Sequence, residues 1–328
     1  MKATAMANAN IALSKYWGKR DKKLMLPQNG SISMTCDGLC TTTTVEFGDY
    51  PEDIIIINDE ELQKEKGDII KHLDLIREIA GIKQKAKMVS ESNFPIAAGL
   101  ASSASGFATL TLAATTAAGL NLNEKELSIL ARRGSGSASR SIPCGFVEWY
   151  RGEKEDGSDS YAETIVDKDY WPEFRMITTI VTEAKKKVSS RAGMAQTVET
   201  CPYYDGWLKT VNDDLNKIRE GIKKKDFSSV GLTAEENCLK MHALMMTTKP
   251  SIIYWFPPTM EIIQSVQLWR EEGLECYFTI DAGPNVKVIC LEKDEKEANK
   301  KLLALNGVIK TIICKPGNKA KIIDEHLF

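Results

Sequence analysis

The pattern of apolar and polar residues along this chain predicts short strands interleaved with amphipathic helices. Apolar and β-branched runs predict strands at 3–14, 41–47, 54–57, 86–90, 145–149, 176–181, 274–280, 286–291 and 308–314. Helical spacing and Ala- or Leu-rich runs predict helices at 69–79, 107–118, 123–133, 207–218, 227–246, 257–273 and 295–305, and another opening at 189. Beyond residue 175 this order is typical of an α+β layer, with helices covering one antiparallel sheet.

Polar residues indicate where these elements begin and end. Asn123 followed three residues later by Glu126 forms a capping box, which favours a helix start. Gly81 follows the helix predicted at 69–79 and is typical of a helix end. The stretch from Asp167 to Pro172 separates the two halves of the pattern. We therefore expect two domains, covering residues 1–172 and 173–328.

Composition excludes several classes of protein. The 328 residues are 43% hydrophobic and carry a net charge of −2, so no general positive field favours nucleic acid or a membrane surface. The first residues lack an apolar stretch typical of a signal peptide, and no apolar run is long enough to cross a membrane. Eight cysteines are scattered without zinc-ligand spacing, so we expect reduced thiols. These features predict a cytoplasmic globular protein.

The most informative segment is the small-residue stretch from Phe94 to Gly106, between a predicted strand and a predicted helix. Glycines allow a ligand to approach the backbone, and a helix start presents free N–H groups to an anion. The hydroxyls of Ser102, Ser103 and Ser105 could add hydrogen bonds to phosphate or to Mg²⁺. The segment matches neither the P-loop nor the dinucleotide-binding fingerprint. Tight helix packing is the alternative interpretation.

Four further segments carry candidate chemistry. Lys15 to Asp21 places basic residues beside aromatic ones, which suits an anion but is also compatible with a solvated turn. Gly134 to Arg140 is a Gly/Ser turn ending in arginine, either an anion clamp or a flexible linker. Ser189 to Met194 places hydroxyls at a helix start. Asp281 to Asn285 is a tight turn led by an acid, which can be catalytic or can simply cap the turn.

Taken together, these segments resemble the GHMP kinase superfamily and, within it, the mevalonate diphosphate decarboxylases. The matching motifs occur in family order and are 10–21, 95–104, 132–141, 145–149, 189–194 and 281–285. The sequence departs from the family pattern at Ser139, where many members have cysteine, and at 142–144, where a more open turn is usual. The helix near 66–77 also lacks a clear match for a basic contact of some members, which Lys66 or Lys71 could supply.

The resemblance implies a fold, a reaction and partners. The fold would pair an N-terminal domain like ribosomal protein S5 domain 2 with a ferredoxin-like α+β C-terminal domain, and the active site would lie between them. The substrate would be mevalonate 5-diphosphate, with ATP and Mg²⁺ as cofactors. The products would be isopentenyl diphosphate, CO₂, ADP and phosphate. The resemblance also implies a homodimer.

It further implies roles for individual residues. The catalytic group would be Asp281, which orients or deprotonates the 3-hydroxyl, Lys15 at the transferring phosphoryl group, and Arg140 and Asn10 at the carboxylate. Substrate contacts would come from Tyr16, Trp17, Gly18, Lys19, Ser135, Gly136, Ser137, Ala138, Ser139, Arg140, Ser189, Ser190 and Arg191. ATP would contact Ala98, Gly99, Leu100, Ala101, Ser102, Ser103, Ala104, Ser105 and Gly106, and Ser102 is the candidate metal ligand.

Other functions share parts of this pattern. A phosphomevalonate decarboxylase would use the same motifs on a monophosphate. A mevalonate 3-kinase would phosphorylate without decarboxylation, but such kinases lack part of the Asp/Lys/Arg set that Asp281, Lys15 and Arg140 complete here. A non-catalytic ATP-binding regulator has no physical need for that set. ATP turnover with mevalonate derivatives distinguishes the enzymes from the regulator.

Overall fold

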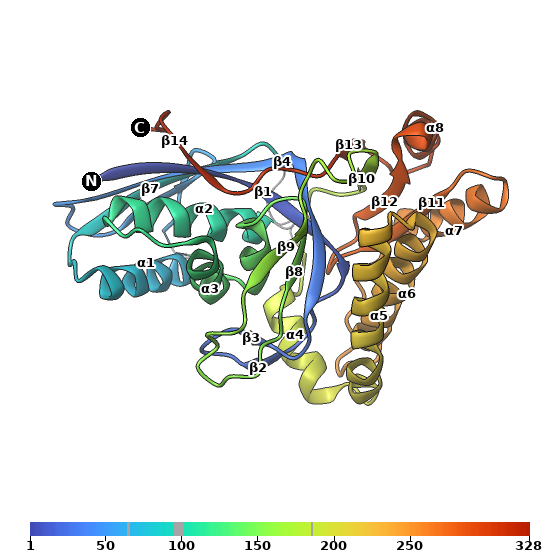
Figure 1. Cartoon of the computed structure of the whole chain (residues 1–328), viewed down its shortest axis with the longest axis horizontal. Coiled ribbons are helices and arrows are strands. Elements are labelled where there is room, and N and C mark those ends of the chain that lie inside the picture. The colour runs from blue at the N-terminus through green and yellow to red at the C-terminus, as the bar shows by residue number, and fades with distance from the viewer. Residues whose placement is uncertain (64–65, 95–101, 185) are drawn as a thin grey trace.

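The computed structural model describes residues 1–63, 66–94, 102–184 and 186–328, and the chain builds two β-sheets with helices packed on them (Figure 1). The first sheet has the order β14-β1-β4-β7-β5-β6, and β8 joins it through β4 with β9 beside β8. Its strands are β1 (Lys2–Ser14), β4 (Ser31–Gly48), β5 (Ile54–Ile57), β6 (Glu60–Glu61), β7 (Lys85–Ser92), β8 (Phe146–Trp149), β9 (Ala162–Val166) and β14 (Lys321–Ile323). A short separate hairpin consists of β2 (Lys19–Asp21) and β3 (Leu26–Pro27).

Three helices cover one face of this first sheet (Figure 1). They are α1 (Gly67–Ala80), α2 (Ser102–Ala117) and α3 (Glu124–Gly134). Leu73 and Ile76 of α1 and Leu110 of α2 pack with Val45 and Phe47 of β4 in one buried cluster. The nearly uncharged α2 thus packs directly on the sheet, and the apolar stripe of α1 joins it in the same buried cluster.

The second sheet is antiparallel throughout, in the order β11-β12-β10-β13. Its strands are β10 (Phe174–Ile180), β11 (Cys276–Ile280), β12 (Val286–Leu291) and β13 (Lys310–Cys314), and its helices are α4 (Ser190–Thr200), α5 (Tyr204–Lys224), α6 (Phe227–Met246), α7 (Pro257–Glu271) and α8 (Glu292–Leu303). Successive residues of β10 belong to different buried clusters, Met176 to one and Ile177 to another. Because strand side chains alternate between faces, both faces of this sheet are covered.

The two sheets share a core. One buried cluster contains Ile11 and Leu13 of β1, Met176 of β10, Ile218 of α5 and Val230 of α6. Helices α5 and α6 therefore pack between the second sheet and the strands of the first (Figure 1). This shared core fixes the end of β1 against the second half of the chain, which is where the candidate site lies.

Most predicted elements are present with boundaries shifted by a few residues, but β4 already begins at Ser31, well before the strand predicted at 41–47. The capping box is observed, with Asn123 Oδ1 accepting from the Glu126 N–H and Glu126 Oε2 accepting from the Asn123 N–H. Gly81 ends α1 at φ 67°. The sequence pattern did not predict the short strands β2, β3, β6, β9 and β14, and all eight cysteines are free thiols. We propose that 1–172 and 173–328 form two domains, although β14 pairs with β1 of the first sheet.

In the parts of the chain that the structure describes, no helix is long and apolar enough to span a membrane.

Candidate active site

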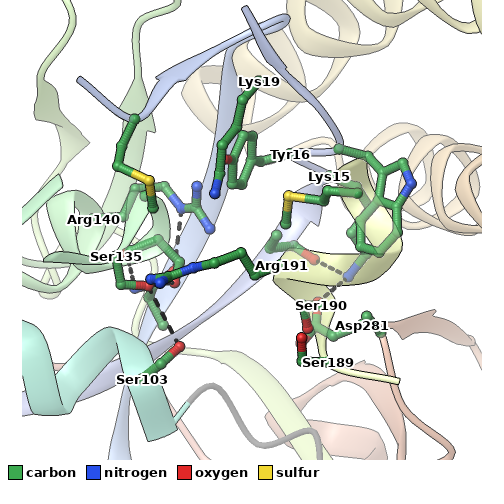
Figure 2. A pocket seen from close by; sticks show the side chains of 18 of the residues that line it. Lys15, Tyr16, Lys19, Ser103, Ser135, Arg140, Ser189, Ser190, Arg191 and Asp281 are labelled. Atoms are coloured by element: carbon green, nitrogen blue, oxygen red, sulfur yellow. Dashed lines mark hydrogen bonds and ion pairs between the residues drawn. The ribbon is translucent and has the colours of Figure 1, made fainter. Parts of the chain in front are cut away.

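A cavity of about 330 Å³ opens between the two halves of the molecule (Figure 2). Residues from the end of β1, the start of α2, the turn after α3, the start of α4 and the turn after β11 meet there. It is lined by Asn10, Ala12, Lys15, Tyr16, Trp17, Lys19, Met25, Ser102, Ser103, Phe107, Ser135, Gly136, Ser137, Arg140, Lys186, Ser189, Ser190, Arg191, Met194, Met241, Asp281 and Ala282. Most of the sequence-predicted site residues are therefore brought together in one place.

The Asp281 carboxylate is held between two buried lysines. The Lys15 ammonium lies 2.6 Å from Asp281 Oδ1, and the Lys287 ammonium lies 3.4 Å from Oδ2. Burial raises the pKa of the Asp281 carboxyl, but the two ammonium groups outweigh burial and hold this pKa well below its usual range. Asp281 is therefore ionised at every pH at which the protein would work.

Arg140 is buried on the opposite wall of the cavity with its guanidinium anchored by three polar groups. Its Nε donates to Asn10 Oδ1 at 3.1 Å and to Ser33 Oγ at 3.0 Å, and its Nη1 donates to Ser31 Oγ. Burial lowers the pKa of Arg140 to about 10, so the guanidinium remains charged near neutral pH. Its Nη2 donates to no described residue, which leaves an aimed donor for an anionic ligand.

A second group of donors lines the mouth of the cavity. Tyr16 is buried edge-on against Trp149, with ring centroids 4.7 Å apart, and its hydroxyl has no hydrogen-bond partner among the described residues. Burial, together with the nearby Arg191 charge, lowers the pKa of Lys19 to about 8. Arg191 is bridged to Asp68 of α1 at 2.5 Å. These side chains can donate to an anion, and the orphaned Tyr16 hydroxyl needs such a partner.

Hydroxyl groups complete the lining. Ser135 Oγ lies 3.3 Å from Ser137 Oγ and 3.5 Å from Ser103 Oγ, so the turn after α3 meets the start of α2 (Figure 2). Ser189 caps α4 by accepting from the Ala192 N–H at 3.2 Å. Ser190 Oγ accepts from Lys186 Nζ at 2.8 Å. Helix starts beside hydroxyls suit phosphate oxygens.

Several predicted contact residues are placed behind the lining. Gly18 adopts φ +108°, and a Cβ there would lie 1.8 Å from the Tyr204 hydroxyl, so this glycine permits close packing. Ala138 and Ser139 are fully buried in the turn after α3, and Ser139 Oγ donates to the Gly136 carbonyl. These residues thus pack behind the cavity lining.

The predicted ATP segment is described only from Ser102 onward, and Ala98, Gly99, Leu100 and Ala101 lie outside the described residues. Ser102 and Ser103 line the cavity. Ala104 and Ser105 are buried, and Ser105 Oγ is bonded to Thr41 Oγ1 at 2.7 Å. Gly106 lies one turn into α2, away from the lining. Ala104, Ser105 and Gly106 therefore support the start of α2 and do not form the cavity surface.

Two lysines that the sequence reasoning missed stand next to Asp281. Lys186 donates to Ser190 Oγ and to the Ala282 carbonyl, both at 2.8 Å, and burial lowers its pKa to about 8. Lys186 has no local signal, because it lies in a run of lysines. Lys287 did have one: it is a lone cation in the apolar strand β12, and a buried lysine needs a paired acid.

The described residues contain no group of three His, Cys, Asp or Glu side chains that could hold a metal ion by themselves. The absence of such a group among the described residues does not exclude Mg²⁺, because Mg²⁺ usually binds one or two protein oxygens and completes its coordination shell with phosphate and water. The Ser102 hydroxyl and the Asp281 carboxylate supply oxygens of that kind at one cavity.

The fold and this cavity define a class of protein, an enzyme of the GHMP kinase superfamily whose site combines anion donors with one carboxylate held by two lysines. The family model "Diphosphomevalonate decarboxylase-like N-terminal domain" matches residues 7–162, and "Mevalonate 5-diphosphate decarboxylase C-terminal domain" matches residues 176–321. The chain therefore belongs to the diphosphomevalonate decarboxylase family, and it is a decarboxylase. The resemblance and the α+β fold inferred from the sequence are confirmed.

Relatives from distant organisms are similar over most of their length. The diphosphomevalonate decarboxylase of Homo sapiens is 36% identical over 309 residues, covering 88% of this chain and 76% of that protein. The crystal structure of the mevalonate diphosphate decarboxylase from Staphylococcus aureus is 39% identical with a TM-score of 0.93, covering 98% of each chain. A structure titled "MDDEF in complex with MVAPP, AMPPCP and Magnesium" is 41% identical with a TM-score of 0.92, covering 99% of each chain.

Proposed function

We propose that this cavity carries out the ATP-dependent conversion of mevalonate 5-diphosphate into isopentenyl diphosphate, CO₂, ADP and phosphate. The observation that carries the proposal is the Lys15–Asp281 pair, 2.6 Å apart, in the same cavity as the anchored guanidinium of Arg140. A carboxylate can orient a hydroxyl, and a cation opposite it can hold a substrate carboxylate. The reaction needs both.

The first step is phosphorylation of the tertiary 3-hydroxyl, because hydroxide itself is a poor leaving group. Asp281 accepts a hydrogen bond from this hydroxyl and aims its oxygen at the phosphoryl group. Since its pKa lies below the usual range, Asp281 is a weak base and takes the proton late, as the new O–P bond forms. Lys15 neutralises charge on the transferring phosphoryl oxygens. The 3-phosphate then leaves, and the electrons of the C1–C2 bond form the alkene as CO₂ departs.

Arg140 and Asn10 orient the carboxylate that is lost. Arg140 is fixed by Asn10, Ser31 and Ser33, and this leaves the Nη2 edge for the C1 carboxylate. A rigid grip keeps the C1–C2 bond aligned with the departing 3-phosphate, and such alignment accounts for much of the barrier reduction in oriented reactions.

The 5-diphosphate is proposed to lie at the mouth of the cavity. Tyr16, Lys19 and Arg191 supply donors there, and the hydroxyls of Ser135, Ser137, Ser189 and Ser190 complete the shell. The Tyr16 hydroxyl remains protonated because burial raises its pKa, so it can act as a donor throughout. Arg191 exchanges its bridge to Asp68 for the diphosphate.

ATP and Mg²⁺ are proposed to enter beside the start of α2. Ser102 and Ser103 line the cavity there, and Ser102 is the proposed metal contact. Lys186, next to Asp281, is added as a contact for the γ-phosphoryl group. The relative's title that names MVAPP, AMPPCP and magnesium supports this assignment. When bound, Mg²⁺ would neutralise phosphate charge.

The proposal includes a homodimer acting in the cytoplasm, and the eight free thiols are compatible with a reducing compartment. The second candidate substrate is mevalonate 5-phosphate, because Tyr16, Lys19 and Arg191 could hold one phosphate as well as two.

One experiment tests the proposal and its alternatives. ADP release and CO₂ release are measured with mevalonate, its 5-phosphate and its 5-diphosphate. The expected result is equal rates of both products, with kcat/KM at least a hundredfold higher for the diphosphate. ADP release without CO₂ would indicate a 3-kinase, and preference for the monophosphate would reassign the substrate. Absence of turnover with all three would contradict the proposal.

A further inference from the structure

The backbone of Lys15 is held on both sides by buried asparagines. Lys15 follows the last residue of β1, where the strand ladder no longer satisfies its peptide groups. Its N–H donates to Asn237 Oδ1 at 2.7 Å, and its carbonyl accepts from Asn29 Nδ2 at 2.8 Å. Asn237 belongs to α6, so a helix from the second half of the chain holds a residue of the first.

Asn237 is in turn fixed by a buried carboxylate. Its Nδ2 donates to Asp214 Oδ2 of α5 at 2.8 Å, and Lys240 Nζ contacts the two Asp214 oxygens at 2.8 and 3.0 Å. Asn237 is 0% and Asp214 2% exposed. The Lys15 N–H needs an acceptor and Asp214 needs a donor, and an amide offers one of each on opposite sides. Neither a carboxylate nor an apolar side chain could satisfy both partners.

We infer that Asn237, anchored by Asp214 and Lys240, is a positioning residue that fixes the Lys15 backbone and thereby aims the Lys15 ammonium at Asp281. The inference rests on the proposed function, because it assigns Lys15 to phosphoryl transfer. The ammonium itself is held by Asp281 Oδ1 and by the Ala12 carbonyl, both within 2.7 Å, so a displaced backbone would draw it away from one of them. A displacement of about 1 Å at a reacting group can cost about 10²-fold in rate.

The variant Asn237→Asp tests this with almost no change of shape. The new carboxylate can still accept from the Lys15 N–H, but it faces the Asp214 carboxylate at hydrogen-bond distance. Two carboxylates so close share a proton at low pH and repel each other once both ionise. The chain of hydrogen bonds from the Lys15 N–H through residue 237 to Asp214 should therefore be intact at low pH and disrupted at high pH.

The measurement is kcat of N237D relative to wild type between pH 5.5 and 8.5. We expect a 10- to 100-fold loss at pH 8.5 that shrinks as the pH falls, with the KM for ATP changed less than threefold. The double variant N237D/D214N reverses the donor and the acceptor, so it should recover most of kcat and remove the pH dependence. Cys238→Ala removes a fully buried neighbour on the same helix that has no hydrogen bond to Lys15, and it should retain wild-type kcat.

Amide hydrogen exchange of the segment containing Lys15 gives a readout that does not need turnover. N237D should lose protection there at high pH, and N237D/D214N should regain it. If N237D is unfolded at pH 8.5, the comparison of the double variant with wild type carries the same test. A constant ratio of kcat across pH with unchanged protection, or a folded double variant no faster than N237D, would overturn the inference. Failure of the wild type itself to turn over would instead count against the proposed function.

Discussion

The Lys15 ammonium lies 2.6 Å from Asp281 Oδ1, although 266 positions separate the two residues in the sequence. Lys15 follows a strand of the first sheet, and Asp281 follows a strand of the second. The pair therefore depends on how the two halves pack. With Lys287 on the other oxygen, two buried cations surround one carboxylate, and this triad carries a net positive charge into an anion-binding cavity.

Replacing Asp281 with asparagine tests the role of its charge. The asparagine side chain would keep the shape of the turn but remove the carboxylate that orients the 3-hydroxyl. We expect kcat to fall by about 10²–10⁴-fold, the usual range for a lost general base, with the KM for ATP nearly unchanged. Product analysis should show ADP and CO₂ falling together, because Asp281 acts before decarboxylation.

Phosphorylation of the 3-hydroxyl at a near wild-type rate by the folded Asp281→Asn protein would reduce Asp281 to a turn residue. Thermal unfolding gives the necessary control, since the substitution also leaves Lys15 and Lys287 without a counter-ion. If the substitution merely lowered stability, kcat calculated for the folded fraction would return to the wild-type value, whereas loss of the catalytic role lowers kcat of the folded protein.

Lys287→Met tests the second cation with a side chain of similar length and no charge. Asp281 would then have one ammonium partner, so its pKa should rise toward the usual range. A carboxyl with a lowered pKa loses its charge, and the stability that this charge contributes, only as pH falls through that folded-state value. The pKa of the Asp281 carboxyl, followed by NMR titration, should therefore be higher in the folded variant than in wild type. An unchanged Asp281 pKa in the folded variant would exclude Lys287 as an influence on Asp281.

The sequence predicts the secondary structure well where the apolar pattern is long. Helix α6 begins and ends where the pattern places it, at Phe227 and Met246. Strand β14 was missed because it has three residues and pairs with β1 across almost the whole chain, so nothing local specifies it. Short elements of this kind are determined by tertiary packing, which local patterns do not contain.

For the candidate site, the sequence predicts which segments meet better than which side chains face the ligand. The motif from Ser135 to Arg140 does line the cavity, but Ser139 points behind it because the turn winds as a tight 3₁₀ helix. Asn237 was not singled out, since a polar residue in a helix carries no sign of the peptide group it holds. Such contacts follow from how α6 packs on β1.

Lys19→Ala should mainly weaken substrate binding. The distal phosphates do not react, so their contacts are equal in the ground state and the transition state. Loss of one charge-assisted hydrogen bond, about 1.5–3 kcal/mol, predicts a 10- to 100-fold rise in the KM for mevalonate 5-diphosphate and a small change in kcat. Lys209→Ala, at an exposed lysine of α5, is the control. A fall in kcat at constant KM would place Lys19 at the reacting end.

The lowered pKa values of Lys19 and Lys186, both proposed to donate to anionic ligands, predict that activity is lost at alkaline pH. Burial lowers the pKa of both Lys19 and Lys186 to about 8, so each is charged below that pH and neutral above it. Because only the ammonium form attracts phosphate, kcat/KM should fall as pH rises through about 8. Asp281 does not contribute to this limb, since it is ionised throughout.

Arginine variants distinguish the contributions of Lys19 and Lys186 to the alkaline limb, because a guanidinium stays charged far above pH 8. Lys19→Arg should flatten the alkaline limb of kcat/KM for mevalonate 5-diphosphate, and Lys186→Arg should flatten the limb for ATP. Each variant leaves the other limb in place, so each serves as the control for its partner. Profiles are recorded at constant ionic strength, since salt alone weakens attraction between charges. If both arginine variants keep the wild-type decline above pH 8, then neither lysine titrates in the free enzyme, and another group sets the alkaline limit.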